Sequence, residues 1–559
     1  MHDLVIRNAL IVDGTGAKPF HGDVAVSNGR IAEIGDKLGP GRETIEAGGR
    51  ALSPGIIDGH THYDAQITWD PFADPSPALG VTTIVIGNCG FTIAPCRPAD
   101  RDLTMRNLTH VEGMSLDALR AGIRWEFESF AEYLAMLERN GVGPNVAAFV
   151  GHSSLRTFVL REDAAKRAAR DDEIAAMRRL VQGAMAAGAV GFATSTNEPH
   201  NGENGIPMPS RLADDRELRA LVKAMGESAR GVFMLTKGSK TSIPYLETIA
   251  ADSGRPVVIA AMFHSNTNPD SVFEGLEQVN AARARGRMLY AQISCCPLTM
   301  DFTLASPYLF EGLETWKPAM EAHGAGLLAV YRDERFRSAV REELRVARGR
   351  RLFNSEWDKL HVVEAAHGKN RALEGRSIEE IARETAKDPL DCLLDLGLEE
   401  NLATGFIAQL MNNDERAVAR LLREPEAHIA LSDAGAHLTF LCDAGFGLHL
   451  IGHWSRDLGV LTLEEAVRRL TSQPARIFGI ADRGRLAPGL AADLILFDPT
   501  SVGRGPKRRV FDLPAGAPRL TTKATGLDGV WVNGKMIADA DGVRDHAPRA
   551  GKVLREFSP

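Results

Sequence analysis

The chain has few cysteines and no long apolar run. Its 559 residues include six cysteines, none of them in a Cys-x-x-Cys pair. Such a sparse set does not form a disulfide framework, so we expect free thiols or metal ligands in a reducing compartment. No apolar run approaches the ~20 residues of a membrane span, and the first residues lack the basic and apolar regions of a signal peptide. These absences predict a cytoplasmic protein.

An excess of positive charge is also missing. The formal net charge is -8, with 25% charged and 44% hydrophobic residues. Nucleic acids and anionic membrane surfaces attract basic proteins, so neither is an expected partner. The composition is that of a globular enzyme, and we expect a small-molecule substrate and a homo-oligomer.

The most informative stretch is residues 53–64, which contains two histidines one residue apart. The apolar pair Ile56 and Ile57 leads into His60 and His62. Alternate side chains of a strand point to the same side, so the two imidazoles face one point. An isolated His-x-His pair is more often solvated surface, but this pair follows an apolar run, where α/β barrels place their chemistry. Neutral imidazoles suit zinc and similar metals, so the stretch predicts half of a metal site.

Seven further apolar runs follow this stretch and alternate with amphipathic helices. This alternation is typical of parallel strands joined by helical crossovers, and eight such strands close into a barrel. We therefore predict an α/β fold with a (β/α)8 TIM-like barrel at residues 54–484. The seven later strands are expected at 81–86, 145–150, 189–193, 231–235, 256–263, 288–293 and 428–431.

An insertion interrupts the predicted barrel at about residues 298–401. It contains several helices, one of which begins at Ser377 with Glu380 three residues later, the spacing of a capping box. On the active face of a barrel, such an insertion could form a lid or a pocket wall.

Both ends of the chain carry hairpin signals. Asn28-Gly29 and Asn533-Gly534 each separate two alternating runs, the pattern of a tight β-turn. We expect residues 1–53 and 485–559 to pair into one β-sandwich beside the barrel.

Several motifs resemble those of the amidohydrolase superfamily. Pro54 to His62 resembles the first-strand signature of that superfamily, and residues 461–499 resemble the passage that ends its barrel. Asn88-Cys89-Gly90 resembles a motif of the D-aminoacylase and N-acyl-D-amino-acid deacylase subgroup, and so does Gly151-His152. The resemblance implies a metal-dependent hydrolase of amide bonds with zinc as the cofactor.

The resemblance also implies roles for single residues. Cys89 would bind metal as a thiolate, although most cysteines of this kind are inert buried thiols. Asp433 would lie beside the metal and act as general base and acid, the alternative being an aspartate that caps a turn. Further candidates for contacts to substrate or to the ligands are Asn88, His152, Ser432 and His437; for His152 a structural hydrogen bond is an equal alternative.

The pattern departs from the subgroup at the fifth and sixth strands, where the subgroup has metal-binding histidines. The fifth strand leads to Thr236 and Lys237, and the sixth has Ala261 at the expected position, with His264 three residues later. Three explanations stay open: His264 joins the metal, Lys237 joins it as an amine or a carboxylated amine, or the second metal site is absent. We expect one zinc ion, held by His60, His62, Cys89 and Asp433, with two ions as the alternative.

The substrate signals of the subgroup are altered too. Its seventh-strand Tyr-Pro-Tyr is replaced by residues 294–297, Ser-Cys-Cys-Pro, and its His-Pro-Arg has no counterpart near His437. We expect hydrolysis of an N-acyl amino acid, with a cyclic amide, ester or lactone as the alternative substrate. A non-catalytic oligomeric scaffold is the alternative from another class of protein.

Overall fold

Eight parallel strands form the central sheet of the computed structural model, which describes residues 1–558 except 112, 347–350 and 437–442. The first and last strands are joined by a bridge between Thr61 and Ala434, where the His62 amide donates to the Ala434 carbonyl over 2.7 Å. This closure confirms the predicted (β/α)8 barrel. In order around the barrel the strands are β6 (Ile56–Asp58), β7 (Val81–Ile86), β8 (Asn145–Gly151), β9 (Gly191–Ser195), β10 (Val232–Thr236), β11 (Val257–Ala260), β12 (Leu289–Ile293) and β16 (His428–Ile429).

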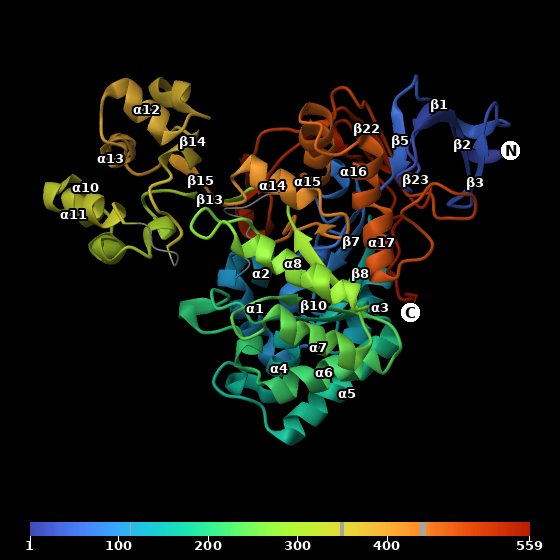
Figure 1. Cartoon of the computed structure of the whole chain (residues 1–559), viewed down its shortest axis with the longest axis horizontal. Helices are drawn as coiled ribbons and strands as arrows, with labels where there is room; N and C mark the ends of the chain where they lie inside the picture. Colours follow the sequence, from blue (N-terminus) through green and yellow to red (C-terminus); the bar gives the residue numbers. More distant parts are fainter. Residues whose placement is uncertain (112, 347–350, 437–442, 559) are drawn as a thin grey trace.

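The barrel strands are apolar and buried along their whole lengths, because helices cover their outer side (Figure 1). Capping residues fix where several of these helices begin. Ser129 and Glu132 form a capping box, and the side chains of Asp214 and Ser242 accept amide hydrogen bonds in the first turns of their helices. The helices include α3 (Phe130–Asn140), α4 (His152–Leu160), α5 (Asp171–Ala187), α6 (Asp215–Gly226), α7 (Ile243–Ser253), α8 (Ser271–Ala284), α14 (Glu415–Leu422), α16 (Leu463–Leu470) and α17 (Ser472–Phe478).

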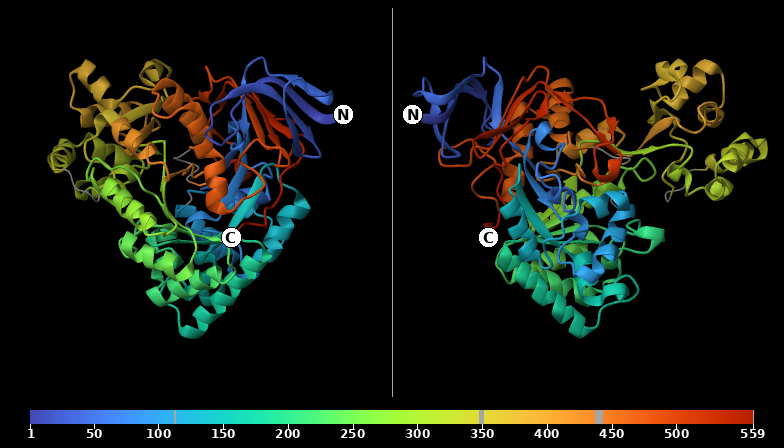
Figure 2. Two further views of the ribbon diagram at one scale, coloured as in Figure 1. Left: turned by 45° about the vertical axis from the view of Figure 1, so that its right-hand side comes forward. Right: turned by 180° about the vertical axis from the view of Figure 1, so that it is seen from behind.

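Strands from both ends of the chain form one nine-stranded sheet beside the barrel (Figure 2). Antiparallel pairing of β5 (Ala51–Pro54) with β17 (Leu494–Phe497) joins the two ends. The sheet has its own apolar core, to which both ends contribute. The two ends therefore pair beside the barrel as predicted for the β-sandwich, and they do so in one separate terminal sheet. Its other strands are β1 (His2–Ile11), β2 (Phe20–Ser27), β3 (Arg30–Gly35), β4 (Gly41–Glu46), β22 (Leu527–Val532), β23 (Lys535–Asp539) and β24 (Gly542–Val543).

The insertion forms a lobe that projects from the barrel (Figure 1, yellow). This insertion lobe runs from β13 (Leu298–Phe302) to β15 (Gly405–Met411), which pair with each other, and it also contains β14 (Leu360–Glu364). Its core is a separate cluster of buried apolar side chains. The sequence predicted its helices but not its three-stranded sheet. The helices are α9 (Lys317–Glu321), α10 (Ala325–Arg332), α11 (Glu334–Leu344), α12 (Ile378–Thr385) and α13 (Pro389–Glu399).

Five cysteines lie in the described ranges, and all five are free thiols. Within those same ranges, no helix combines the length and the apolar character needed to cross a membrane.

Candidate metal centre

Four predicted ligands meet at the carboxyl ends of the barrel strands. His60 and His62 follow β6, Cys89 follows β7, and Asp433 follows β16. One ligand atom from each of His60, His62 and Cys89 lies within 4.8 Å of the others, and all three side chains are buried. Asp433 Oδ1 lies 3.2 Å from His60 Nε2 and 3.6 Å from His62 Nε2.

These separations fit a divalent ion in the middle of the group. Zinc binds nitrogen at about 2.0–2.1 Å and sulfur at about 2.3 Å, so tetrahedral ligand atoms lie about 3.3–3.6 Å apart. In the structure, His60 Nε2 lies 3.6 Å from Cys89 Sγ and 3.2 Å from Asp433 Oδ1. The donor set of two imidazoles, a thiol and a carboxylate also suits zinc.

Two of the four candidate ligands have a backbone conformation that residues other than glycine seldom adopt. The φ angle is +56° at Cys89 and +47° at Asp433. Such residues cost free energy, so they persist where the surrounding structure holds them, and they are frequent at functional sites.

Neighbouring hydrogen bonds fix the backbone around the histidines. The Ser432 hydroxyl donates to the His60 carbonyl over 3.1 Å. The Asn88 side-chain amide donates to the carbonyls of Thr61, over 3.3 Å, and Val85, over 2.8 Å. Asn88 and Ser432 thus lie next to the ligands.

Three further residues contact the ligands and were missed in the sequence. Gln292 Oε1, on β12, accepts a hydrogen bond from His60 Nδ1 over 2.7 Å, which leaves Nε2 free to face the centre. The Asp58 carboxylate accepts from the His60 amide over 3.2 Å, and the Thr236 hydroxyl lies 3.0 Å from Cys89 Sγ. The one feature of the sequence that could have indicated these three residues is that each is a polar residue within, or at the end of, an apolar strand.

The electrostatics of the centre favour a bound cation. Burial alone would raise the pKa of the Cys89 thiol, but the adjacent His60 and His62 hold that pKa below its ordinary value. Burial lowers the pKa of His60, yet Cys89 and Asp433 raise it above its ordinary value. Burial raises the pKa of Asp58 to about 7. The shifts of Cys89 and His60 describe a thiolate beside a positively charged imidazole, whereas burial favours the protonated form of Asp58.

Other predicted site residues lie apart from the centre. Both ring nitrogens of His152 are engaged elsewhere, with Thr194 Oγ1 and Glu217 Oε1, each 2.8 Å away. These hydrogen bonds agree with the structural role that the sequence offered as an alternative for His152. His264 is buried with its ring 6.2 Å from that of Phe273 on α8, so the structure does not bring it into the cluster.

Lys237 lines the same cavity as His60, His62, Cys89 and Asp433, and its role as a metal ligand stays a prediction. It follows β10 directly, where the chain has already left the strand. His437 falls in 437–442, outside the described residues.

A large cavity opens over the centre. Its volume is about 1070 Å³, and His60, His62, Cys89 and Asp433 form its floor. The insertion lobe and the loops after β9, β10 and β11 supply its walls. This volume lies at the upper end of the range for small-molecule sites.

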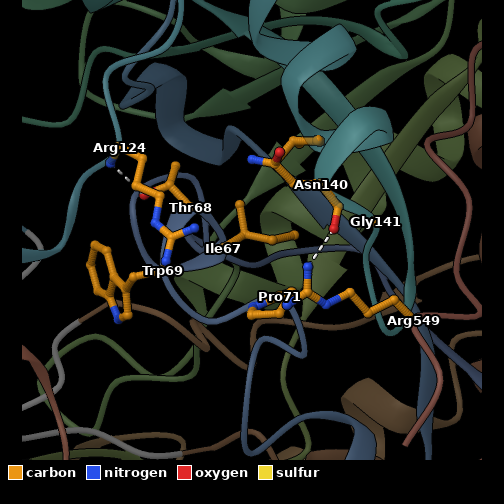
Figure 3. Close-up of a pocket in the computed structure, with 9 residues that line it drawn as sticks. Ile67, Thr68, Trp69, Pro71, Arg124, Asn140, Gly141 and Arg549 are labelled. Atoms are coloured by element: carbon orange, nitrogen blue, oxygen red, sulfur yellow. Dashed lines mark hydrogen bonds between the residues drawn. The ribbon is translucent and has the colours of Figure 1, made fainter.

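A second hollow, beside Thr68, Arg124 and Asn140, is much smaller (Figure 3). Its volume of about 30 Å³ suffices for one or two water molecules. None of the four candidate ligands lines it. The large cavity is therefore the candidate substrate site.

Comparisons with known proteins agree with this geometry. Residues 43–538 match the model of the "Amidohydrolase family". A D-aminoacylase of Alcaligenes xylosoxydans xylosoxydans is 30% identical over 99% of this chain and 97% of its own, and an N-acyl-D-aspartate deacylase of the same organism is 28% identical over 99% and 95%. The crystal structure of a D-aminoacylase superposes with a TM-score of 0.67 at 27% identity and covers 100% of both chains.

An N-acyl-D-glutamate deacylase from Bordetella bronchiseptica, complexed with zinc and a phosphonate inhibitor, has the same TM-score of 0.67 at 26% identity, covering 99% of this chain and 100% of its own. Both the sequence match and these structures extend over almost the whole chain. The chain therefore belongs to the amidohydrolase family and is a hydrolase of that family.

Proposed function

We propose that this protein hydrolyses the amide bond of N-acyl-D-amino acids with the help of one zinc ion. The observation that carries the proposal is the group of His60, His62, Cys89 and Asp433, whose spacing fits a single divalent ion. The named activities of the relatives, D-aminoacylase and N-acyl-D-aspartate deacylase, support the substrate class. A cytoplasmic location and a homo-oligomeric state remain predictions of the sequence.

The residues of the chain would share the chemistry in a simple way. These four residues would hold a divalent ion, which, with a further position open to water, would polarise the scissile carbonyl and lower the pKa of that water. Asp433 accepts the proton of the attacking water at its carboxylate and then delivers it to the departing nitrogen. Gln292 keeps the proton of His60 on Nδ1, so that Nε2 remains a ligand.

The residues at the ends of β10 and β11 favour one metal ion over two, because none of the expected histidine ligands is present there. A crystal structure of a D-aminoacylase has been described with a binuclear metal centre. Here the residues that line the cavity at the carboxyl ends of β10 and β11 include Thr236, Lys237 and Ala261. Among the described residues, the cluster of ligands comprises His60, His62 and Cys89, with Asp433 beside it. Thr236 is near Cys89 but brings a hydroxyl instead of an imidazole.

The test is the release of free amino acid from N-acetyl-D-leucine by zinc-reconstituted enzyme. Asp433→Asn removes the proton acceptor, so we expect kcat to fall by about 100-fold or more. Metal content by elemental mass spectrometry should be about one ion per chain, lost in Cys89→Ala. Asp36→Asn, an exposed control, should change neither value.

Two results would contradict the proposal. One is full activity in Asp433→Asn, and the other is an active wild-type enzyme that stays metal-free. Two ions per chain would contradict only the single-ion part.

A further inference from the structure

The cavity over the metal centre is larger than a short N-acetyl amino acid requires, and its walls differ in character. A cationic side chain, Lys237, lies on the loop after β10. Leu298, Leu410 and Met411 of the insertion lobe form an apolar wall that begins after β12. Strand β11 separates the two walls around the barrel mouth.

Lys237 is available to bind an anion. No ion pair joins it to a carboxylate among the described residues, and its side chain is exposed to the cavity. Arg351, the other long cation among the described residues of the cavity wall, is bound to the Glu343 carboxylate and to the carbonyls of Glu343 and Val346.

Hydrogen bonds hold the Lys237 loop in place. The Gly238 amide donates to Thr196 Oγ1 over 2.9 Å, and the Ser239 amide donates to Glu198 Oε1 over 3.0 Å. The Glu198 carboxylate is thus engaged by Ser239, whose hydroxyl also donates to it. An ammonium on a fixed loop is suited to bind a carboxylate by a charge-assisted hydrogen bond.

The apolar wall is built from paired strands. Leu298 and Met411 are cross-strand partners in β13 and β15, and Leu410 lies beside Met411. Phe91 and Phe263, from the loops after β7 and β11, extend the apolar surface toward the metal centre. Apolar surface of this extent gains free energy when it is covered by a chain of methylene groups.

A molecule with its scissile amide at the metal centre would meet both walls if it carried an anion on one side and an apolar chain on the other. We propose that the substrate is a long-chain N-acyl amino acid, whose carboxylate binds Lys237 and whose acyl chain lies against Leu298, Leu410 and Met411. This inference rests on the proposed function, because the amide must lie at the same metal centre.

The experiment compares N-acetyl-D-leucine with N-octanoyl-D-leucine, each as the free acid and as the carboxamide. For the wild type, kcat/KM should rise at least about tenfold from acetyl to octanoyl, because each buried methylene tightens binding. Lys237→Met should raise KM for the acids by about 10- to 100-fold, with kcat and the carboxamides little changed. Lys237→Arg should retain part of the affinity, and Lys240→Met, on the same loop but off the cavity, should have no effect.

The apolar wall has its own pair of variants. Met411→Ser should reduce the advantage of octanoyl over acetyl several-fold, whereas Met320→Ser, at an exposed site of the insertion lobe, should leave it unchanged. Calorimetric binding of the four compounds to Asp433→Asn provides a readout that does not need turnover.

The outcomes separate the two proposals. Equal binding of acid and carboxamide, or of acetyl and octanoyl compounds, would overturn the amphiphilic substrate even in an active deacylase. If the enzyme does not turn over the substrates but binds the octanoyl acid preferentially, and this binding depends on Lys237, the proposed reaction is wrong. The proposed class of ligand would still be supported.

Discussion

At the scale of single residues, Gln292 orients His60 for the metal. Its carboxamide oxygen lies 2.7 Å from His60 Nδ1 in a buried position on β12. Gln292→Met removes this acceptor, and we expect metal affinity to fall about 10- to 100-fold, as for similar partners of metal-binding histidines. Competition with a zinc chelator measures the affinity, with exposed Gln278→Met as control. Unchanged affinity would mean that packing alone positions the ring.

Site residues that directly follow a barrel strand could be predicted from the sequence. Site residues whose contacts depend on how several strands are aligned could not. His60, His62, Cys89 and Asp433 each follow a barrel strand directly, so closure of the barrel brings them together. Gln292 meets His60 across 232 positions, and no local pattern reveals that register. His264 was an open candidate because of its spacing, but β11 ends at Ala260 and the ring turns toward α8.

At the scale of elements, we expect Asp301 to make the stability of β13, at the start of the insertion lobe, depend on pH. Burial raises its pKa to about 6, although Lys507 and Arg509 act to lower it. An aspartate in the unfolded chain has its ordinary pKa of about 3.8. The folded state therefore binds the proton more tightly, and this stabilisation, full below pH 3.8, is lost as the pH rises to about 6.

Asp301→Asn removes this titration, so its effect should depend on pH. We expect the free energy of unfolding of the variant, relative to that of the wild type, to rise by about 2 kcal/mol between pH 4 and pH 7.5. Two pKa units correspond to nearly 3 kcal/mol. Hydrogen exchange of β13 and β15 at both pH values measures the local stability. Asp541→Asn, on the surface, is the control. An equal effect at both pH values would contradict the assignment.

Among the elements, the barrel strands were easier to predict than the insertion lobe. A strand such as Val81–Ile86 is a short apolar run buried on both sides, and such runs are visible in the sequence. The strand β15 has a mixed burial pattern, and its partners β13 and β14 lie far from it in the chain. Its apolar residues therefore gave no clear period.

At the scale of the whole molecule, the insertion lobe is an attachment with its own core. Phe302 and Phe406 are paired partners at its base, so a two-residue Asn-Gly turn can replace residues 303–405. With Phe302→Thr and Phe406→Thr to remove newly exposed aromatic rings, we expect the barrel to fold and to keep its zinc. KM should rise, because the cavity loses part of its wall.

Circular dichroism, metal analysis and steady-state kinetics of this shortened protein test the expectation. A barrel that no longer folds would show that the two cores depend on each other. Unchanged KM for the octanoyl substrate would show that the lobe contributes nothing beyond its two base strands.

Because β5 pairs with β17, the strand that leads into the metal centre gains one of its neighbours only when the end of the chain has been synthesised. Strand β5 ends at Pro54 and β6 begins at Ile56, only a few residues before His60 and His62. Its partner β17 is made more than 400 residues later, at Leu494–Phe497. While the ribosome is still translating the barrel, the edge of β5 that will pair with β17 has no partner strand. Strand β5 leads directly into β6, the strand that precedes His60 and His62. The terminal sheet therefore stays incomplete until the last part of the chain has left the ribosome.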